Sequence, residues 1–312
     1  MWNDKYRYEG KLIGTKENRE YISSLAGLEK ARQEGKILEG VVKMCDSSTL
    51  EMHVDLFGID GIIPKEESVY GVDVKDIAII PRVGKAVAFK VMEIDYSGGK
   101  PRAILSRREA QRECMQEYLM DLIPGDIIPV KITHFEPFGA FVDVGCGIAA
   151  LMSVDSISVS RISSPRDRFY PRQEIMVVVK SVDYETGRIF VSTKELFGTW
   201  EENASKFSTG QTVSGVVRSV ESYGIFVELA PNLAGLAELK ENVRVGDGCS
   251  VYIKSIMPEK MKIKLVIIDT YEAEKQTQGE DFFPLSPEKA GHISYWRYSP
   301  LCCDRVIESR YE

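Results

Sequence analysis

A seven-residue motif that occurs twice in register constrains this chain more than any other feature. The two copies are Phe138-Gly139-Ala140-Phe141-Val142-Asp143-Val144 and Tyr223-Gly224-Ile225-Phe226-Val227-Glu228-Leu229. Both read aromatic, Gly, small or apolar, Phe, Val, acid, apolar, and a small residue followed by Leu comes nine residues after the central Phe, at 150–151 and 235–236. A repeat that keeps its register over this length indicates two copies of one structural unit.

A fainter third copy lies upstream. It runs Leu50-Glu51-Met52-His53-Val54-Asp55-Leu56 and is followed by Gly61-Ile62-Ile63. The framework is kept, but Leu50 and His53 stand at the two aromatic positions. The pattern therefore predicts a third unit with the same fold and a different surface.

Strand-like runs surround each motif. A run of β-branched residues precedes the motif at 127–135 and at 213–220, and two more runs follow it in every copy. The following runs cover 86–94 and 102–106, 175–182 and 188–192, and 249–256 and 262–268, each pair split by a turn. About five short strands per unit are typical of a small closed or nearly closed barrel, so we predict a mainly β chain of three tandem barrels.

Helical segments separate the predicted barrels. The runs 107–122 and 194–206 are expected to be helices that join barrels one and two and barrels two and three. Asn18 to Glu34 is expected to be a helix packed on the first barrel. The predicted organisation is an N-terminal helical segment over 1–35, repeat one over 36–109, repeat two over 124–196, repeat three over 209–269 and a tail over 270–312.

The C-terminal tail breaks the pattern. It contains Pro284, Pro287 and Pro300, the polar run 274–278 and the aromatic cluster Tyr295-Trp296-Arg297-Tyr298. Two alternatives stay open for this segment. It is either irregular and partly disordered, or it folds back on the third barrel.

The paired aromatics of the motif suggest a ligand. Single-stranded RNA offers flat bases that stack on aromatic rings and phosphates that meet Lys or Arg, and each stack contributes about 1–3 kcal/mol. Strict alternation would put Phe138 and Phe141 on opposite faces of a strand, so we expect a bulge or bend at Gly139 to bring both to one outer face, with Ala140 and Val142 pointing inward. The same is expected of Tyr223, Gly224 and Phe226. The alternative, that the rings are core residues, suits a lone Phe better than a repeated motif.

Basic residues lie near the motif in repeats two and three. The segment 161–172 carries four Arg in a Ser- and Pro-containing loop, and Arg can both pair with phosphate and stack on bases. The predicted RNA-binding residues are Phe138, Phe141, Lys131, His134, Arg161, Arg166, Arg168, Arg172 and Arg188 in repeat two, and Tyr223, Phe226, Arg218, Lys254 and Lys262 in repeat three. Repeat one has neither aromatic and carries Glu51 and Asp55, so a protein contact or a structural role suits it better.

Composition bounds the compartment and the partners. The net charge of −7 argues against nucleic acid when taken alone, but binding needs only a local basic groove. The polar N-terminus and the lack of an apolar run of about 20 residues predict no signal peptide and no membrane contact. Six scattered cysteines suit a reducing compartment, so we expect a cytoplasmic protein that is a monomer when free.

The sequence contains no catalytic constellation. Only three His are present, none in a zinc-type motif, and the adjacent Cys302-Cys303 lack the spacing of metal-binding cysteines. We therefore expect neither an enzyme nor a metal site, and no cofactor.

The repeats resemble the RNA-binding domain of ribosomal protein S1, the largest protein of the bacterial small subunit. The motif residues carry this resemblance together with the closing-strand residues Val191-Ser192-Thr193-Lys194, and the run Gly198-Thr199-Trp200-Glu201-Glu202-Asn203 looks like the shorter S1-like proteins of Gram-positive bacteria. The resemblance implies OB-fold barrels that bind single-stranded messenger RNA and associate with the small ribosomal subunit. It also implies that N-terminal repeats contact ribosomal protein.

One departure from this family ranks the repeats. The family often has His two residues after the Gly-Leu pair, whereas Pro64, Ser153 and Glu238 hold this position here. An acid at 238 would repel phosphate if it faced the groove, so repeat two is the first choice for the RNA site.

A function from another class stays open. In that alternative the chain is an adaptor whose barrels mainly contact protein in a transcription or RNA-decay assembly. Phosphate-driven RNA binding weakens linearly with log salt, which separates the two functions.

Overall fold

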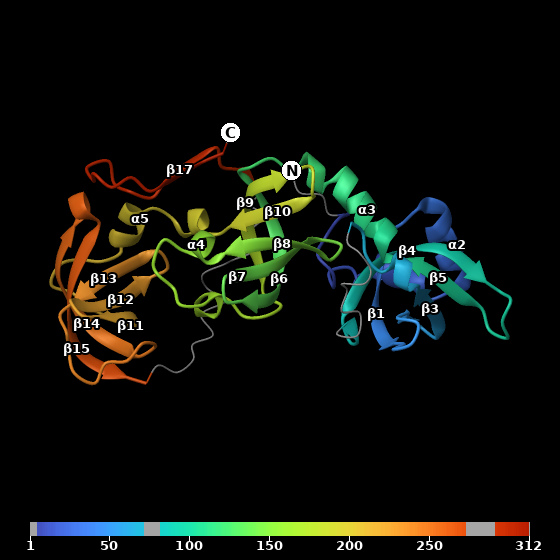
Figure 1. The fold of residues 1–312 in the computed structure, drawn as a ribbon, viewed down its shortest axis with the longest axis horizontal. Coiled ribbons are helices and arrows are strands. Elements are labelled where there is room, and N and C mark those ends of the chain that lie inside the picture. The colour runs from blue at the N-terminus through green and yellow to red at the C-terminus, as the bar shows by residue number, and fades with distance from the viewer. Residues whose placement is uncertain (1–4, 72–81, 273–290, 312) are drawn as a thin grey trace. The chain divides into compact units, whose positions relative to one another are not determined.

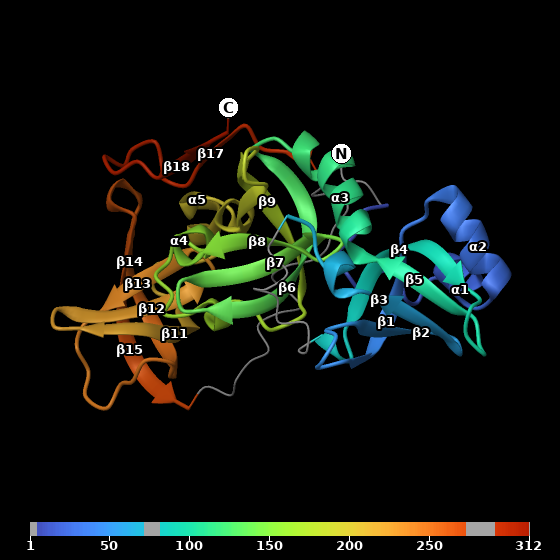
Figure 2. The same ribbon diagram turned by 45° about the vertical axis from the view of Figure 1, so that its right-hand side comes forward.

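The computed structural model describes residues 5–71, 82–272 and 291–311, and its regular structure is mainly β (Figures 1 and 2). Three five-stranded barrels follow one another along the chain, as the repeat predicts. The chain divides into two compact units, the first with residues 1–122, 143–150 and 182–188 and the second with residues 123–142, 151–181 and 189–312. Repeat two thus contributes segments to both units, whereas repeat three lies within the second.

Repeat one is a closed barrel with the strand order β1-β2-β3-β5-β4, in which β1 pairs with β4. Its elements are β1 (Leu38–Cys45), β2 (Met52–Leu56), β3 (Ile59–Ile63), the 3₁₀ helix η1 (Lys65–Glu67), β4 (Ala86–Asp95) and β5 (Arg102–Ser106). Val42, Met52 and Val54 are at most 1% exposed. Their alternation with exposed residues is the period-two pattern that fills a barrel interior.

Repeats two and three follow the same strand order, and in repeat two β6 also pairs with β9. Repeat two consists of β6 (Asp126–Glu136), β7 (Gly139–Gly145), β8 (Ile148–Ser153), α4 (Val154–Ile157), η5 (Pro165–Asp167), β9 (Glu174–Asp183) and β10 (Arg188–Ser192). Repeat three consists of β11 (Thr212–Glu221), β12 (Gly224–Ala230), β13 (Leu233–Ala237), β14 (Gly248–Met257), η7 (Pro258–Lys260) and β15 (Lys262–Tyr271). The predicted strands are therefore present in all three barrels.

The N-terminal segment forms two helices, α1 (Lys16–Ile22) and α2 (Leu25–Glu34). The prediction of one helix over 18–34 is wrong at Ser24, whose extended backbone and side chain cap α2 by accepting a hydrogen bond from the Gly27 N–H. Leu28 and Ala31 join the core of repeat one, as predicted.

The segments that link the barrels are helical but short. The first contains α3 (Arg107–Glu117) and η4 (Leu119–Asp121), close to the predicted run. The second contains η6 (Lys194–Phe197) and α5 (Trp200–Ala204), so the continuous helix predicted over 194–206 is wrong. Gly198, at φ +78° and ψ 178°, takes an extended positive-φ conformation that favours glycine and ends the first piece, and Thr199 then caps the second.

The described part of the tail folds back on two barrels. Its strand β16 (Gly291–His292) pairs with β6, and β17 (Tyr295–Arg297) pairs with β18 (Glu308–Arg310). Trp296 and Tyr298 belong to the core cluster of repeat three, whereas Tyr311 packs among residues of repeat two. Of the two alternatives, folding back on the third barrel is the one observed; the contact with repeat two was not predicted. Pro284, Pro287 and the polar run 274–278 lie outside the described residues.

Candidate nucleic-acid interface

Repeats two and three each carry two aromatic rings at nearly right angles. The ring centroids of Phe138 and Phe141 are 6.1 Å apart with an interplanar angle of 84°. Those of Tyr223 and Phe226 are also 6.1 Å apart, at 89°. The first ring of each pair is exposed, 57% for Phe138 and 67% for Tyr223, and the second is half-buried. This arrangement leaves a ring face on which a nucleotide base can stack.

A two-residue turn, rather than a bulged strand, carries the first aromatic. Pro137 and Phe138 form the turn between β6 and β7, and β7 begins at Gly139. Of the bulge or bend expected at Gly139, the structure has a change of direction in the turn that directly precedes it and no bulge within the strand. Ala140 and Val142 do point inward, as predicted, and both are 0% exposed. Ser222 and Tyr223 form the corresponding turn of repeat three.

Glycine is required at the first position of these strands because the neighbouring backbone approaches closely. A Cβ atom on Gly139 would lie 2.3 Å from the carbonyl oxygen of Met152. On Gly224, which has φ +155°, it would lie 2.7 Å from the carbonyl oxygen of Ala237. A side chain here would push the turn and its aromatic ring away from the barrel.

Strand register extends each aromatic pair into a row of side chains across the barrel. In repeat three, Phe226 lies opposite Ser219 on β11 and opposite Leu236 on β13. Leu236 in turn lies opposite Lys264 on β15. The repeat-three row, residues 219, 226, 236 and 264, therefore ends in an exposed cation.

The repeat-two row, aligned by its motif with that of repeat three, consists of His134, Phe141, Leu151 and Phe190. It contains more aromatic surface. The His134 ring stacks on Phe141 with centroids 4.7 Å apart and planes at 7°. Further along, Leu151 lies opposite Phe190, which is 37% exposed. Phe190 is not among the RNA-binding residues predicted from the sequence. Its alternation with Ile189 in β10 nevertheless puts Phe190 on the same outer face as Arg188.

The repeat-one row has no aromatic pair. Its members are Met44, His53, Ile62 and Ile104. The imidazole Nδ1 of His53 lies 3.2 Å from the carboxylate of Asp60. This row is apolar with one histidine held by an acid, which agrees with the sequence-based view that repeat one is a poor stacking surface.

Two predicted RNA-binding cations are buried in a charge cluster. Arg168 and Arg218 both bind the carboxylate of Glu228, with Arg168 Nη1 3.0 Å from Glu228 Oε2. The three side chains are 3%, 10% and 6% exposed. Burial lowers the pKa of the Arg168 guanidinium, and Glu228 opposes that shift. The prediction for Arg168 and Arg218 is corrected, because neither guanidinium lies on the surface that phosphate binding requires.

Three arginines of the same loop stay at the surface. The Arg161 guanidinium is 3.1 Å from the Glu221 carboxylate and is 77% exposed. Arg166 lies over the Phe135 ring at 4.9 Å, and Arg172 is exposed. Of the other predicted cations, Arg188, Lys254 and Lys262 are exposed and Lys131 is half-buried.

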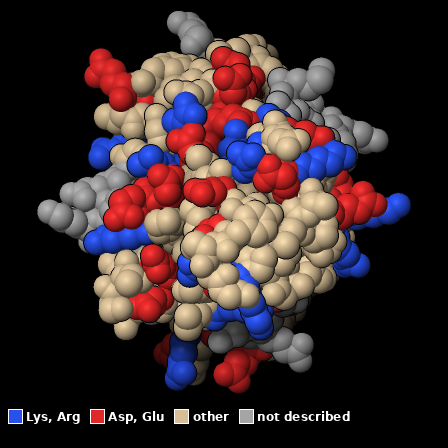
Figure 3. Space-filling model, turned by 90° about the vertical axis from the view of Figure 1, so that its right-hand side faces the viewer, with Lys and Arg blue, Asp and Glu red and all other residues tan. Residues whose placement is uncertain are grey.

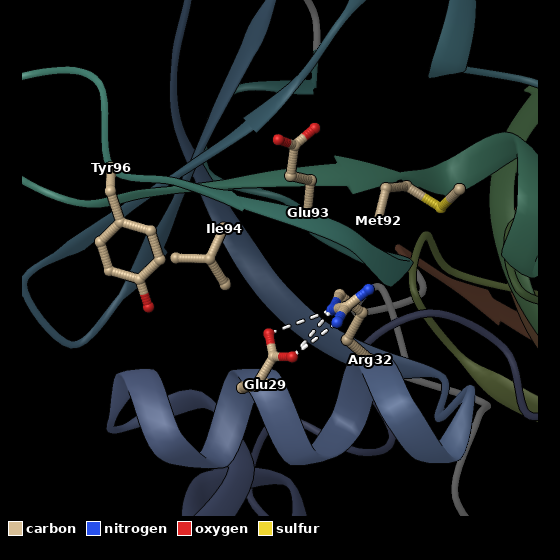
Figure 4. Close-up of a pocket in the computed structure, with 6 residues that line it drawn as sticks. All are labelled: Glu29, Arg32, Met92, Glu93, Ile94 and Tyr96. Atoms are coloured by element: carbon tan, nitrogen blue, oxygen red, sulfur yellow. Dashed lines mark hydrogen bonds and ion pairs between the residues drawn. The ribbon is translucent and has the colours of Figure 1, made fainter.

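A groove on repeat one is separate from the aromatic pairs. Arg32 forms an ion pair with Glu29 there, at 2.6 Å (Figure 4). Acidic and basic side chains are interspersed on the face seen in Figure 3. The groove itself is lined by Glu29, Arg32 and Glu93, so it offers no uniform charge for an anionic ligand. Its lining residues are Glu29, Arg32, Met92, Glu93, Ile94 and Tyr96.

Within residues 5–71, 82–272 and 291–311, no cluster of three or more His, Cys, Asp or Glu side chains could hold a metal ion. The His292 Nδ1 atom lies 3.0 Å from Asp126, and Cys302 and Cys303 are free thiols, one exposed and one buried. No helix in the described part of the chain has the length and apolar character needed to span a bilayer.

The chain is similar to proteins that contain the same kind of domain. The family model described as "S1 RNA binding domain" matches residues 121–194, which include all strands of repeat two. The chain is 31% identical over 258 residues to the small ribosomal subunit protein bS1 homolog of Bacillus subtilis, a match that covers 80% of this chain and 63% of that protein. It is 29% identical over 244 residues to bS1 of Staphylococcus aureus, covering 76% and 60%. For bS1 of Rhizobium meliloti the identity is 27% over 281 residues, covering 84% and 48%.

The chain thus spans 48–63% of the length of these relatives. Its three barrels share one strand order, and the similarity to bS1 proteins extends well beyond the single matched domain. The chain is thus similar to bacterial ribosomal protein S1 proteins over most of its length, and repeat two matches their RNA-binding domain.

Proposed function

We propose that this chain binds single-stranded RNA through the aromatic pairs of repeats two and three. We further propose that it does so as a cytoplasmic protein of the small ribosomal subunit, with messenger RNA as its ligand. The observation that carries the proposal is the recurrence of one geometry: two perpendicular rings 6.1 Å apart, the first of them exposed, in both barrels. The names of the matched domain and relatives support it.

Stacking explains why such a site would tolerate many sequences. Every base has a π-face, and each base stacked on a ring contributes about 1–3 kcal/mol. The exposed cations Arg161, Arg172 and Lys262 are available to meet phosphates, so the net charge of −7 does not oppose a local contact. Bases in duplex RNA are already stacked and paired, so a single strand is the expected ligand.

A titration with a labelled single-stranded oligoribonucleotide at low salt tests the proposal. Replacing Phe138 and Phe141 together by Ala is expected to weaken binding at least about 30-fold, because two stacking surfaces of about 1–3 kcal/mol each are lost. The matched control is Phe57→Ala, which removes a 60% exposed aromatic from repeat one and is expected to leave affinity unchanged. Equal affinities for the two variants would contradict stacking at this pair.

Salt and duplex controls separate RNA binding from the adaptor function. Log affinity is expected to fall linearly with log salt as phosphate contacts are screened. A duplex of the same sequence should bind more weakly. If the chain bound neither RNA at low salt, the adaptor function would replace the proposed one.

We assign repeat one to protein contact on the small subunit. Its outer row is apolar, and Met44 and Phe57 are 50% and 60% exposed. Exposed apolar side chains of this size favour a protein partner over a phosphate backbone. Met44→Glu combined with Phe57→Glu is expected to reduce co-sedimentation with small ribosomal subunits while oligonucleotide affinity is kept. Unchanged co-sedimentation would remove repeat one from the contact.

A further inference from the structure

One loop of repeat two is docked on repeat three. This docking loop, residues 158–173, connects α4 to β9 and belongs to the same compact unit as repeat three (Figures 1 and 2). The Ser158 hydroxyl and the Val159 N–H both donate to Asn232 Oδ1, at 3.0 and 2.7 Å. Asn232 is fully buried in the turn between β12 and β13, at φ +63°. Its Nδ2 donates to the Lys194 carbonyl at 2.7 Å, so one side chain ties three segments together.

The buried charge cluster is the second anchor of the docking loop. Arg168 comes from the loop, whereas Glu228 and Arg218 come from β12 and β11 of repeat three. The Asp167 carboxylate of the loop lies 3.4 Å from the Arg218 guanidinium. Glu228 is two residues beyond Phe226 on the same strand, and in a strand such residues share a face. The loop therefore covers the outer face of repeat three directly beside its aromatic pair.

Two exposed arginines of the docking loop lie near the two aromatic pairs. Arg161 pairs with Glu221, the last residue of β11, which directly precedes the turn that holds Tyr223. Arg166 lies over Phe135, the residue that follows the histidine of the repeat-two row. The two residues of repeat three that directly precede Tyr223 are Glu221 and Ser222, an acid and a neutral residue, so the loop supplies a cation there that they do not.

The tail provides a second tie between the two barrels. Its strand β16 pairs with β6 of repeat two, and the Tyr311 hydroxyl donates to Glu195 at 2.7 Å. Trp296 and Tyr298 pack in the core of repeat three, and the Tyr298 hydroxyl donates to the carbonyl of Asn232. Two independent sets of contacts thus hold repeats two and three in one arrangement.

We propose that repeats two and three form a single track for one RNA strand, in which the docking loop joins the two aromatic pairs and Arg161 contacts a phosphate between them. The proposal rests on the proposed function and adds that the pairs act together. Because both pairs are held in one unit, an RNA that reaches both binds the second pair intramolecularly. Linkage of this kind raises affinity by about 10²- to 10⁴-fold.

Fluorescence anisotropy of the full chain with two labelled oligouridines tests the track. A barrel of this type contacts roughly 4–16 nucleotides, so a short RNA of about 6 nucleotides fills one site and a long RNA of about 20 can reach both. The long RNA is expected to bind at least about 100-fold more tightly than the short one. In the variant with Tyr223→Ala and Phe226→Ala, this advantage should shrink to the few-fold gain that extra binding registers give, while the short RNA still binds at repeat two.

The role of Arg161 is tested with a matched control. Arg161→Ala is expected to weaken the long RNA about fivefold and leave the short RNA within about twofold, the effect of one phosphate contact at low salt. The control is Arg112→Ala, which removes another exposed arginine that pairs with a glutamate, in α3. Equal long-RNA affinities for these two variants would overturn the role of Arg161.

The two proposals fail in different ways. Binding of the short RNA without any further gain for the long one would overturn the single track and leave the proposed function intact. No binding of either RNA at low salt would overturn the proposed function itself.

Discussion

Repeats one and three close into the same barrel but use an equivalent charge pair in different ways. In both barrels the register of the first strand shifts directly after an inward valine, and a cation occupies the shifted position. This cation is Lys43 in repeat one and Arg218 in repeat three. Each cation pairs with the acid of the motif: Lys43 with Asp55 at 2.8 Å, and Arg218 with Glu228. The first pair is 59% and 42% exposed, and the second 10% and 6%.

The difference comes from what covers the pair. In repeat three the docking loop adds Arg168 and excludes water, whereas in repeat one the pair stays in solvent. In repeat two the motif acid Asp143 instead accepts N–H groups of Glu9, Gly145 and Gly147. The motif acid therefore binds a different partner in each barrel. Its contribution to the free energy of unfolding depends on its burial and not on the motif.

The largest expected effect comes from removing this acid in repeat three. Glu228→Ala leaves the buried Arg168 guanidinium without its carboxylate partner and Arg218 with Asp167 alone, and is expected to cost about 3–5 kcal/mol of unfolding free energy in the second unit. The equivalent Asp55→Ala breaks an exposed pair and should cost under about 1 kcal/mol. Hydrogen exchange of β11–β12 and β1–β2 measures each locally. Similar losses of unfolding free energy in the two strand pairs would contradict the role of burial.

A pH-dependent effect distinguishes repeat one from repeat three. Glu39 on β1 is 1% exposed and accepts N–H groups of Gly10, Leu12 and Ile13 at 3.0, 2.8 and 3.1 Å. Burial raises the pKa of this carboxyl from 4.5 to about 7, against the opposing effect of these hydrogen bonds. Repeat three has Ser214 at the equivalent position, next to Gly215.

The sign follows from proton binding. Between pH 4.5 and about 7 the folded state keeps a proton on Glu39 that the unfolded state has released, so stability falls as pH rises through this window. Glu39→Gln should remove a change of about 2 kcal/mol between pH 5 and 7. Hydrogen exchange of residues 10–13 and 38–45 at several pH values measures it. A parallel pH profile in the variant would exclude Glu39 as the titrating group.

A smaller effect is expected at the fourth position of each row, which holds Phe190 in repeat two and Ile104 in repeat one. Phe190→Ala should weaken RNA binding about tenfold, the loss of one stacking surface. Ile104→Ala should leave RNA affinity unchanged. Oligonucleotide anisotropy measures both, and an unaltered affinity of the Phe190 variant would restrict the repeat-two site to its first three row members.

The smallest effect is expected from grafting the aromatic pair onto repeat one. Leu50→Tyr with His53→Phe should raise RNA affinity less than about threefold, under about 0.7 kcal/mol. Leu50 sits at φ +60° and is followed by Glu51, so the grafted rings lack the glycine that seats the turn. A gain as large as the loss in the repeat-two pair would show that residue identity alone makes the site.

Local patterns predicted the barrels and the aromatic pairs well. Apolar alternation and the in-register motif identified the strands, and the inward direction of Ala140 and Val142 is as predicted. The errors lie where single residues decide the backbone: Ser24 and Gly198 divide predicted helices, and the first aromatic sits in a turn. Phe190 was missed because its position in the row depends on a parallel pairing with β8, which no local pattern encodes.

The sequence by itself determined that the chain repeats one barrel and that two of the three copies carry aromatic rings. This was possible because alternation and motif register are properties of neighbouring residues. Only the tertiary structure decided which charges remain available to a ligand. Arg161 and Arg168 look alike in the sequence, yet one is exposed and the other is buried against Glu228 of the next repeat. Burial is set by what packs against a side chain, and here that partner comes from a distant part of the chain.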